Sequence, residues 1–405
     1  MPQAYNLQGD ALYANPYPLY QRLRSDHPVH LDTSLGCWVV TAYRDVALAL
    51  SNRSLSSERF MSATAFKDES WQKLAPLLVY VSNLMFFADP PKHTRLRSLV
   101  SKIFSAHMIE TWRGHIQRVV DERLDLVYEK RQMDVIRDIA LPLLIQVIAD
   151  MFGIPANDQP QFKRWSDDLA EFLGMPPTLK LYTRLMQSIE EFMAYFRSIV
   201  AQRRDQRHRS THQQEDLIDV LILARDHADA LSEDELLVNC IGLFAGGHET
   251  TTNLIGNGLL ALLRNRAELQ KLQNNPQLIV SAVEECLRYD SPVQFTARKA
   301  LEHISIRGKK ISKGQSVLLM LGAANRDPDQ FHDPDRFDIS RQENRHLAFG
   351  HNIHYCVGAA LGRLEAQIAI NTILRRMPEL QLTPQPLRWQ ENLSFHGVKE
   401  LLVSF

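Results

Sequence analysis

The 405-residue sequence has few cysteines, and none of its four cysteines lies near another. Disulfide frameworks and structural zinc sites usually need closely spaced cysteine pairs, so the spacing disfavours both and indicates a reducing compartment. No apolar run approaches about 18 residues. The first ten residues also lack the basic and apolar regions of a secretory signal. We therefore expect a cytoplasmic protein without a membrane anchor.

An excess of charge of one sign is also missing, because 46 basic residues face 47 acidic ones. This balance gives no reason to expect nucleic acid or an anionic membrane as a partner. No repeat, low-complexity segment or linker divides the chain, and an apolar content of 45% supports a sizeable core. We expect a single domain over residues 1–405 and a monomer.

Helical periodicity dominates the sequence and predicts a mainly α protein with a minor β part. Strand patterns are confined to residues 37–41 and 297–320, with turn signals at Arg307-Gly308-Lys309 and Ser312-Lys313-Gly314. The segments with helical periodicity are 110–130, 134–152, 159–173, 179–204, 232–264 and 277–290.

The most informative cysteine is Cys356, in the segment Phe349-Gly350-His351-Asn352-Ile353-His354-Tyr355-Cys356-Val357-Gly358, which precedes a helical pattern. A helix N-terminus supplies amides and a positive dipole end, which stabilise a negative sulfur atom. Glycine at 358 would let the backbone lie close to a flat porphyrin. A thiolate bound to haem iron favours O–O cleavage. The segment therefore indicates an oxygen-activating enzyme.

Two other interpretations of this segment remain open at this point. His346, His351 and His354 could join Cys356 in a zinc cluster, although structural zinc sites usually contain paired cysteines. Cys356 could also be an ordinary buried cysteine.

The segment resembles the haem loop of the cytochrome P450 family, whose pattern is Phe-Gly-x-Gly-x-His-x-Cys-x-Gly. Asn352 replaces the second glycine, and because asparagine tolerates positive φ, we predict positive φ there. The resemblance spans nearly the whole chain. It implies a helix-rich triangular prism with small β-sheets, and haem b whose iron is bound by the Cys356 thiolate. The matching residues are Phe349, Gly350, His354, Cys356 and Gly358.

The segment 232–264 predicts one long buried helix that begins at a capping box, Ser232–Glu235. It contains a glycine pair, Gly246-Gly247, which costs about 1 kcal/mol per residue relative to alanine. By resemblance, Gly246 belongs to a groove for O2, Thr250 is the alcohol and Glu249 the acid of the proton-delivering pair. The Thr250 hydroxyl could also bond the carbonyl of Gly246. The alternative is a glycine pair that serves only helix packing, beside a salt-bridged glutamate.

The resemblance also implies residues around the haem and the substrate. His93, Arg97, Arg298 and His354 would bind the two propionates, which need cationic partners. Glu285, Arg288 and Arg336 would form a buried structural ion cluster, which needs full hydrogen bonding to offset desolvation. Five residues are candidate substrate contacts: Leu84, Leu243, Val293, Phe295 and His396.

These features predict a haem-thiolate monooxygenase that inserts one oxygen atom of O2 into a hydrophobic substrate, of the fatty acyl, terpenoid or steroid, or polyketide class. No Gly-x-Gly-x-x-Gly follows a strand, so electrons should come from a separate ferredoxin and its reductase. Two alternatives remain: a peroxygenase driven by hydrogen peroxide, and a haem-binding protein that docks a partner without catalysis. The expected ferredoxin contacts are Lys92, Arg95, Lys102 and Arg363.

Overall fold

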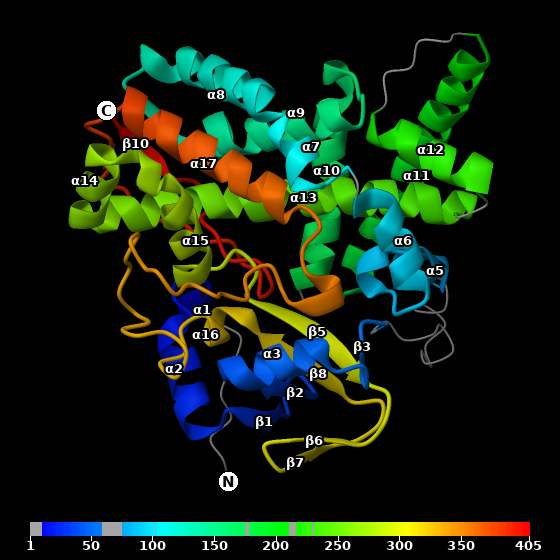
Figure 1. Cartoon of the computed structure of the whole chain (residues 1–405), viewed down its shortest axis with the longest axis horizontal. Helices are drawn as coiled ribbons and strands as arrows, with labels where there is room; N and C mark the ends of the chain where they lie inside the picture. The colour runs from blue at the N-terminus through cyan, green and yellow to red at the C-terminus, as the bar shows by residue number, and fades with distance from the viewer. Residues whose placement is uncertain (1–9, 59–74, 102, 175–177, 210–215, 229–230) are drawn as a thin grey trace. The chain divides into compact units, whose positions relative to one another are not determined.

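The computed structural model describes residues 10–58, 75–101, 103–174, 178–209, 216–228 and 231–405 (Figure 1). Two compact units alternate along the chain, and each is described by itself below. The single-domain assignment of residues 1–405 stays a prediction. Among the described helices, none is both long and apolar enough to cross a membrane. The first unit comprises Met1–Ser56, Glu110–Leu143 and Thr250–Phe405, and the second comprises Ser57–Ile109 and Leu144–Glu249.

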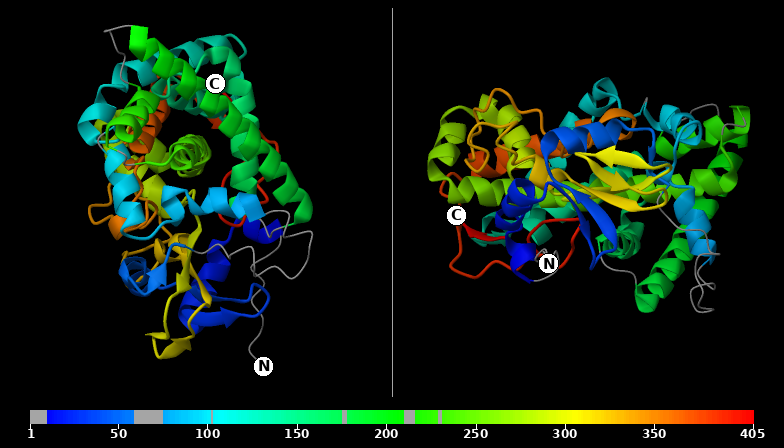
Figure 2. Two further views of the ribbon diagram at one scale, coloured as in Figure 1. Left: turned by 90° about the vertical axis from the view of Figure 1, so that its right-hand side faces the viewer. Right: turned by 90° about the horizontal axis from the view of Figure 1, so that it is seen from below.

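A five-stranded sheet in the order β1-β2-β8-β5-β3 forms part of the first unit. Strands from the N-terminal segment and from residues 295–320 lie side by side in it (Figures 1 and 2). The pair β2 and β8 is parallel and the other pairs are antiparallel. Both predicted strand regions are confirmed. The strands are β1 (Val29–Asp32), β2 (Cys37–Val40), β3 (Leu55–Ser56), β5 (Phe295–Ala300) and β8 (Ser316–Met320), with the hairpin β6 (Ile304–Ile306) and β7 (Lys309–Ile311).

In the first unit α17 packs against α8 and α15, whereas α16 packs against α2 and α3 near the sheet (Figure 1). Helix α17 buries an apolar face that runs its whole length, from Ala359 to Leu374, so it is a core element. The helices of this unit are α1 (Asp10–Ala14), α2 (Tyr17–Asp26), α3 (Tyr43–Ser51), α8 (Arg113–Tyr128), α14 (Arg266–Asn274), α15 (Ile279–Tyr289), α16 (Leu321–Ala324) and α17 (Ala359–Arg376).

The second unit is helical, and its core contains a cluster of aromatic rings carried by several helices. Phe162 is central, because its ring contacts those of Trp165, Phe192, Phe196 and Phe244 at centroid distances of 4.7 to 5.8 Å. Such pairs stabilise a core beyond their buried area. The helices are α5 (Ala75–Ser82), α6 (Lys92–Ser101), α10 (Gln159–Gly174), α11 (Leu179–Arg209) and α12 (Leu217–Ala228), while α7 (Ala106–Glu110) and α9 (Leu141–Met151) each span a unit boundary.

Helix α13 (Glu233–Arg264) is shared by both units, and its predicted extent and capping box are confirmed. The Ser232 hydroxyl accepts a hydrogen bond from the Glu235 amide at 3.1 Å. The Glu235 carboxylate in turn accepts one from the Ser232 amide at 3.0 Å. This reciprocal arrangement satisfies two amides that would otherwise be unpaired at the helix start.

The predicted helix over 134–152 is only partly correct, because a strand and a π-helix precede α9. Strand β4 (Gln132–Asp134) pairs with β10 (Leu402–Ser404), which also pairs with β9 (Gln381–Leu382). Residues Val135–Ala140 then form the π-helix. The Asp134 carboxylate accepts hydrogen bonds from the Ile136 and Leu401 amides. A contact with the C-terminal strand therefore decides this boundary, not local periodicity.

Candidate functional site

The loop before α17 presents the thiol of Cys356 at the start of that helix. The Cys356 amide donates a hydrogen bond to the Phe349 carbonyl at 2.8 Å, which closes the loop on itself. The side chain of Cys356 is exposed. Helix α17 begins three residues later, so its positive end lies near the sulfur and favours a negative charge there.

Two left-handed residues shape the loop. Gly350 has φ of 73° and Asn352 has φ of 58°, so the predicted positive φ at Asn352 is confirmed. A Cβ atom built on Gly358 would meet no atom within 4 Å. The exposed thiol and this open backbone at Gly358 fit a flat group bound through sulfur.

The other three cysteines are poorly suited to bind a metal. Cys37, Cys240 and Cys286 are buried, whereas Cys356 is exposed. Burial raises the pKa of Cys37 to about 12 and raises the thiol pKa of Cys240 and Cys286 further. A thiolate, not a thiol, is the ligand for metals. The interpretation of Cys356 as an ordinary buried cysteine is therefore wrong.

The loop is held by a carboxylate on α15, Glu284, which the sequence analysis did not predict. Both oxygens of Glu284 accept hydrogen bonds from Arg363 on α17, at 2.6 and 2.8 Å. The Arg363 guanidinium also lies 4.5 Å from the centre of the Phe349 ring and donates to the Tyr355 hydroxyl. Burial acts to raise the pKa of Glu284, but hydrogen bonds from Arg363 and His346 lower it to about 2. The pair therefore stays ionised and holds the loop.

The alternative zinc cluster is not supported. His346 lies 3.1 Å from a Glu284 oxygen, so it belongs to the anchor of the loop. His351, His354 and Cys356 do not form a group with metal-ligand spacing. Within the part of the chain that the structure describes, the one such group lies on α10 and α13.

A second carboxylate on α15, Glu285, forms a fully buried ion pair with Arg288 at 2.8 and 2.9 Å. The predicted third member, Arg336, is wrong as a side-chain partner. Its side chain is exposed, and its backbone carbonyl accepts from Arg288 at 3.1 Å. The second guanidinium at Glu285 comes from Arg341, at 3.2 Å, because the loop between Pro334 and Arg341 folds back over the carboxylate.

The first unit carries two of the residues predicted to bind propionates. Arg298 lies on β5 and is 5% exposed, with hydrogen bonds to the Thr296 hydroxyl at 3.1 Å and the Ala297 carbonyl at 2.9 Å. His354 ends a short 3-10 helix (Asn352–His354) in the loop and is half-buried.

The second unit carries the other two, His93 and Arg97, one turn apart on α6. Burial, and then the charge of Arg97, lower the pKa of His93 and outweigh the opposing effect of Asp89. His93 is therefore neutral at neutral pH. It can donate one hydrogen bond to a carboxylate, while Arg97 supplies the charge.

The glycine pair of α13 has two different surroundings. A Cβ on Gly247 would lie 3.4 Å from the Ile148 side chain on α9, which is an ordinary van der Waals contact. A Cβ on Gly246 would meet only the Phe86 ring, at 3.7 Å. Phe86 is 38% exposed and was not among the predicted contacts. The predicted roles of Gly246, Glu249 and Thr250 stay predictions.

The candidate substrate contacts differ in exposure. Leu84 and Leu243 are buried in the second unit, and Leu84 packs against Gly242 of α13, where a Cβ would lie 2.5 Å from its side chain. Val293 and Phe295 are half-buried in the first unit. All four stay predictions.

His396 has partners within the first unit, and its predicted substrate contact stays a prediction. Its ring stacks on Trp389 at 4.7 Å, and its Nε2 lies 3.2 Å from the Asp290 carboxylate. Burial acts to raise the pKa of Asp290, but His396, Tyr17 and Arg326 outweigh it and lower the pKa. His396 is thus held by a carboxylate inside the core of the first unit.

The predicted ferredoxin contacts are partly neutralised by neighbours. Arg95 makes two hydrogen bonds with Glu235, at 3.0 and 2.6 Å, and Arg363 is paired with Glu284. Lys92 donates a hydrogen bond to the Asn83 side chain. Because that side chain is neutral, this contact does not neutralise the charge of Lys92. Lys102 lies outside the described residues. The charge available for docking is therefore smaller than the sequence indicates.

The carboxyl of Glu365 on α17 is buried, and no ion pair or hydrogen bond among the described residues offsets the cost of its burial. It is 2% exposed, and its Oε2 atom has no hydrogen-bond partner among the described residues. Burial raises its pKa well above the ordinary value. The folded protein therefore binds this proton more tightly than the unfolded chain does. The stability that this provides is complete below about pH 4.5 and is lost as pH rises towards the folded pKa.

We expect Glu365→Gln to remove this pH dependence. Near pH 5 the variant and the parent should melt at similar temperatures. As pH rises to 8.5, the melting temperature of the variant should increase relative to that of the parent. Each pKa unit of the shift is worth about 1.4 kcal/mol. Thermal unfolding of the haem-loaded protein at pH 5, 7 and 8.5 measures the effect, with the exposed Glu343→Gln as the matched control. Parallel melting curves across this range would show that Glu365 is compensated.

Comparisons with known proteins agree with this site. The family model for cytochrome P450 matches residues 78–392. The biotin biosynthesis cytochrome P450 of Bacillus subtilis (strain 168) is 42% identical, over 96% of each chain.

Two solved structures are also similar. P450BioI in complex with hexadec-9Z-enoic acid ligated acyl carrier protein is 40% identical and has a TM-score of 0.89, with 98% of this chain and 99% of that one covered. A myxobacterial cytochrome P450 in complex with myristic acid is 37% identical, with a TM-score of 0.88 and 98% of both chains covered. The chain therefore belongs to the cytochrome P450 family, and it is a monooxygenase with thiolate-ligated haem b.

Proposed function

We propose that this monooxygenase oxygenates a long acyl chain, of the fatty acyl class, and receives its electrons from a separate ferredoxin. The exposed thiol of Cys356 at the start of α17 is the observation that carries the catalytic part of the proposal. The acyl class is supported by the two similar structures that hold a hexadecenoyl chain on its carrier and myristic acid.

The haem, when bound, supplies the redox centre at which O2 is activated. Cys356 would hold the iron through sulfur, and the pair of Arg363 and Glu284 would keep the loop in place. The residues proposed to bind propionates are His93 and Arg97 of the second unit and Arg298 and His354 of the first. A neutral His93 would orient its carboxylate partner by a hydrogen bond, and the arginines would neutralise the charge.

Two residues in the middle of α13, Glu249 and Thr250, would transfer protons. Glu249 is proposed to exchange protons with solvent, and the hydroxyl of Thr250 would hand one proton at a time to the reacting oxygen. Gly246 would keep this part of the helix free of side-chain bulk. Neighbouring residues on a helix point in different directions, so the acid can face solvent while the alcohol faces the reaction.

A binding series tests the acyl assignment. Spin-state titrations of the haem-loaded protein with C12, C14 and C16 fatty acids should show affinity rising roughly fourfold for each added methylene, since burying a methylene yields about 0.8 kcal/mol. The C16 chain on an acyl carrier protein and testosterone complete the series.

A spin shift with testosterone and none with any acyl chain would contradict the proposed substrate. For the electron supply, turnover should require a ferredoxin and its reductase. Full turnover with hydrogen peroxide alone, and none with ferredoxin, would instead identify a peroxygenase.

A further inference from the structure

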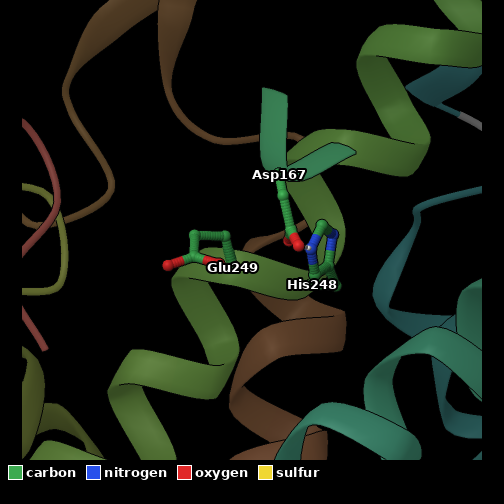
Figure 3. Close-up of side chains that lie close together, drawn as sticks. All are labelled: Asp167, His248 and Glu249. Carbon is green, nitrogen blue, oxygen red and sulfur yellow. Dashed lines mark ion pairs between the residues drawn. The ribbon is translucent and has the colours of Figure 1, made fainter. Parts of the chain in front are cut away.

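Three polar side chains of the second unit form a cluster that the proposed function does not explain. Asp167 lies on α10, and His248 and Glu249 lie on α13 (Figure 3). One ligand atom from each lies within 4.8 Å of the other two, and no other group of His, Cys, Asp and Glu among the described residues meets this spacing.

His248 is the least ordinary member of the cluster. It is fully buried, and neither ring nitrogen has a hydrogen-bond partner among the described residues. Its Nε2 atom points at the Asp167 carboxylate, with 3.8 Å between Nε2 and Oδ1 (Figure 3). That distance is too long for a hydrogen bond. A buried imidazole without a hydrogen-bond partner is unfavourable, so a polar partner at this point would stabilise the unit.

The spacing fits two atoms that share one metal ion. Ligand atoms about 2.0–2.2 Å from a zinc ion lie about 3.4 Å apart at the tetrahedral angle, and never more than about 4.4 Å apart. The 3.8 Å between His248 and Asp167 falls inside this range. The limit of 4.8 Å for the cluster exceeds it slightly. Glu249 would need to move by up to about 1.4 Å to reach the tetrahedral separation, which its rotatable side chain allows.

Asp167 is prepared to receive a cation and is accessible to one. Its Oδ2 accepts a hydrogen bond from Lys163, one turn earlier on α10, which leaves Oδ1 towards His248. An aspartate is ionised at neutral pH, so this oxygen can bind a cation. The Asp167 side chain is 43% exposed, which provides an entry path from solvent.

We propose that Asp167, His248 and Glu249 form a binding site for one zinc ion. One imidazole and two carboxylates suit a borderline divalent cation, with water as a fourth ligand. Magnesium and calcium favour six or more oxygen ligands, which this cluster does not offer.

Occupation of the site by zinc would engage Glu249. Because that glutamate is the proposed proton donor, zinc should lower the product formed per NADPH oxidised; this consequence rests on the proposed function. The binding site itself does not depend on that role. Zinc that binds without inhibiting would leave the site standing and count against Glu249 as the donor.

Zinc binding to the haem-loaded protein tests the proposal directly. After treatment with a chelator, the protein is titrated with zinc sulfate against a chromogenic chelator. About one zinc ion should bind per chain. Asp167→Asn and His248→Gln should each weaken the affinity on the order of 100-fold, since loss of a ligand costs at least as much as loss of a group that supports one. The reduced, carbon-monoxide-bound spectrum checks that each variant retains its haem and fold.

The matched control is an exposed pair of the same chemistry. His332 and Asp333 lie 3.4 Å apart at the surface, with a His332 side chain that is 93% exposed. His332→Ala should leave zinc binding unchanged. X-ray absorption at the zinc edge should show nitrogen and oxygen ligands at about 2.0–2.2 Å. Zinc lost in His332→Ala but kept in Asp167→Asn, or no stoichiometric zinc at all, would overturn the proposal.

Discussion

Replacing Cys356 with alanine will abolish the red-shifted Soret band of the reduced, carbon-monoxide-bound protein and reduce monooxygenase turnover to background. The band depends on a thiolate bound to iron, and a thiolate also promotes O–O cleavage. The side chain of Cys356 lies outside the buried core, so its truncation leaves no cavity in the fold. Loss of the band would therefore report ligation and not unfolding.

Two variants complete this experiment. Cys240→Ala removes a fully buried thiol from the second unit and should keep the red-shifted band. Cys356→His offers an imidazole in place of sulfur, so haem should remain bound while its Soret band loses the red shift. A thiolate-type band that persists in Cys356→Ala would mean that another residue holds the iron, and the assignment of the loop would be wrong.

Local patterns in the sequence predicted several features of the fold and of this loop. The capping box of α13, the positive φ at Asn352 and the salt bridge between Glu285 and Arg288 all depend on residues close together in the chain. Spacing along one helix decides such contacts, so periodicity and residue type are sufficient to find them.

Contacts between distant segments could not be predicted in this way. Glu284 and Arg363 are 79 residues apart, and nothing in either local pattern marks them as a pair. The choice of Arg341 in place of Arg336 depends on the path of an irregular loop over Glu285. Asp167 and His248 meet because α10 packs near α13 within the second unit, which only tertiary structure can show.

Buried polar atoms without partners are also invisible in a sequence. The isolated carboxyl of Glu365 lies in a helix with ordinary periodicity, and nothing in its local sequence marks it as buried. His248 precedes Glu249 and Thr250, which the sequence assigned to oxygen handling. Nothing in the local sequence indicated that His248 itself is buried. Both residues emerge only when burial and hydrogen bonds are considered together.

Thr250→Ala is expected to separate electron consumption from product formation. The variant should retain haem and the thiolate spectrum, since Thr250 is not a ligand. NADPH oxidation should continue, while the ratio of product to NADPH falls at least about tenfold and hydrogen peroxide appears in its place. A positioned proton donor contributes about 10²–10⁴ to rate, so its loss lets a competing release of peroxide win. Quantifying product, peroxide and NADPH in the same reaction measures the partition.

Two further variants decide whether the hydroxyl itself is responsible. Thr250→Ser keeps the hydroxyl and should preserve most of the coupling. Thr252→Val, two positions further along α13, removes a buried hydroxyl that has no hydrogen-bond partner among the described residues. Because Thr252 points in another direction on the helix, its loss should leave the product ratio unchanged. Equal uncoupling in Thr252→Val and Thr250→Ala would attribute the effect to packing of α13, and unchanged coupling in Thr250→Ala would remove Thr250 from the proton path.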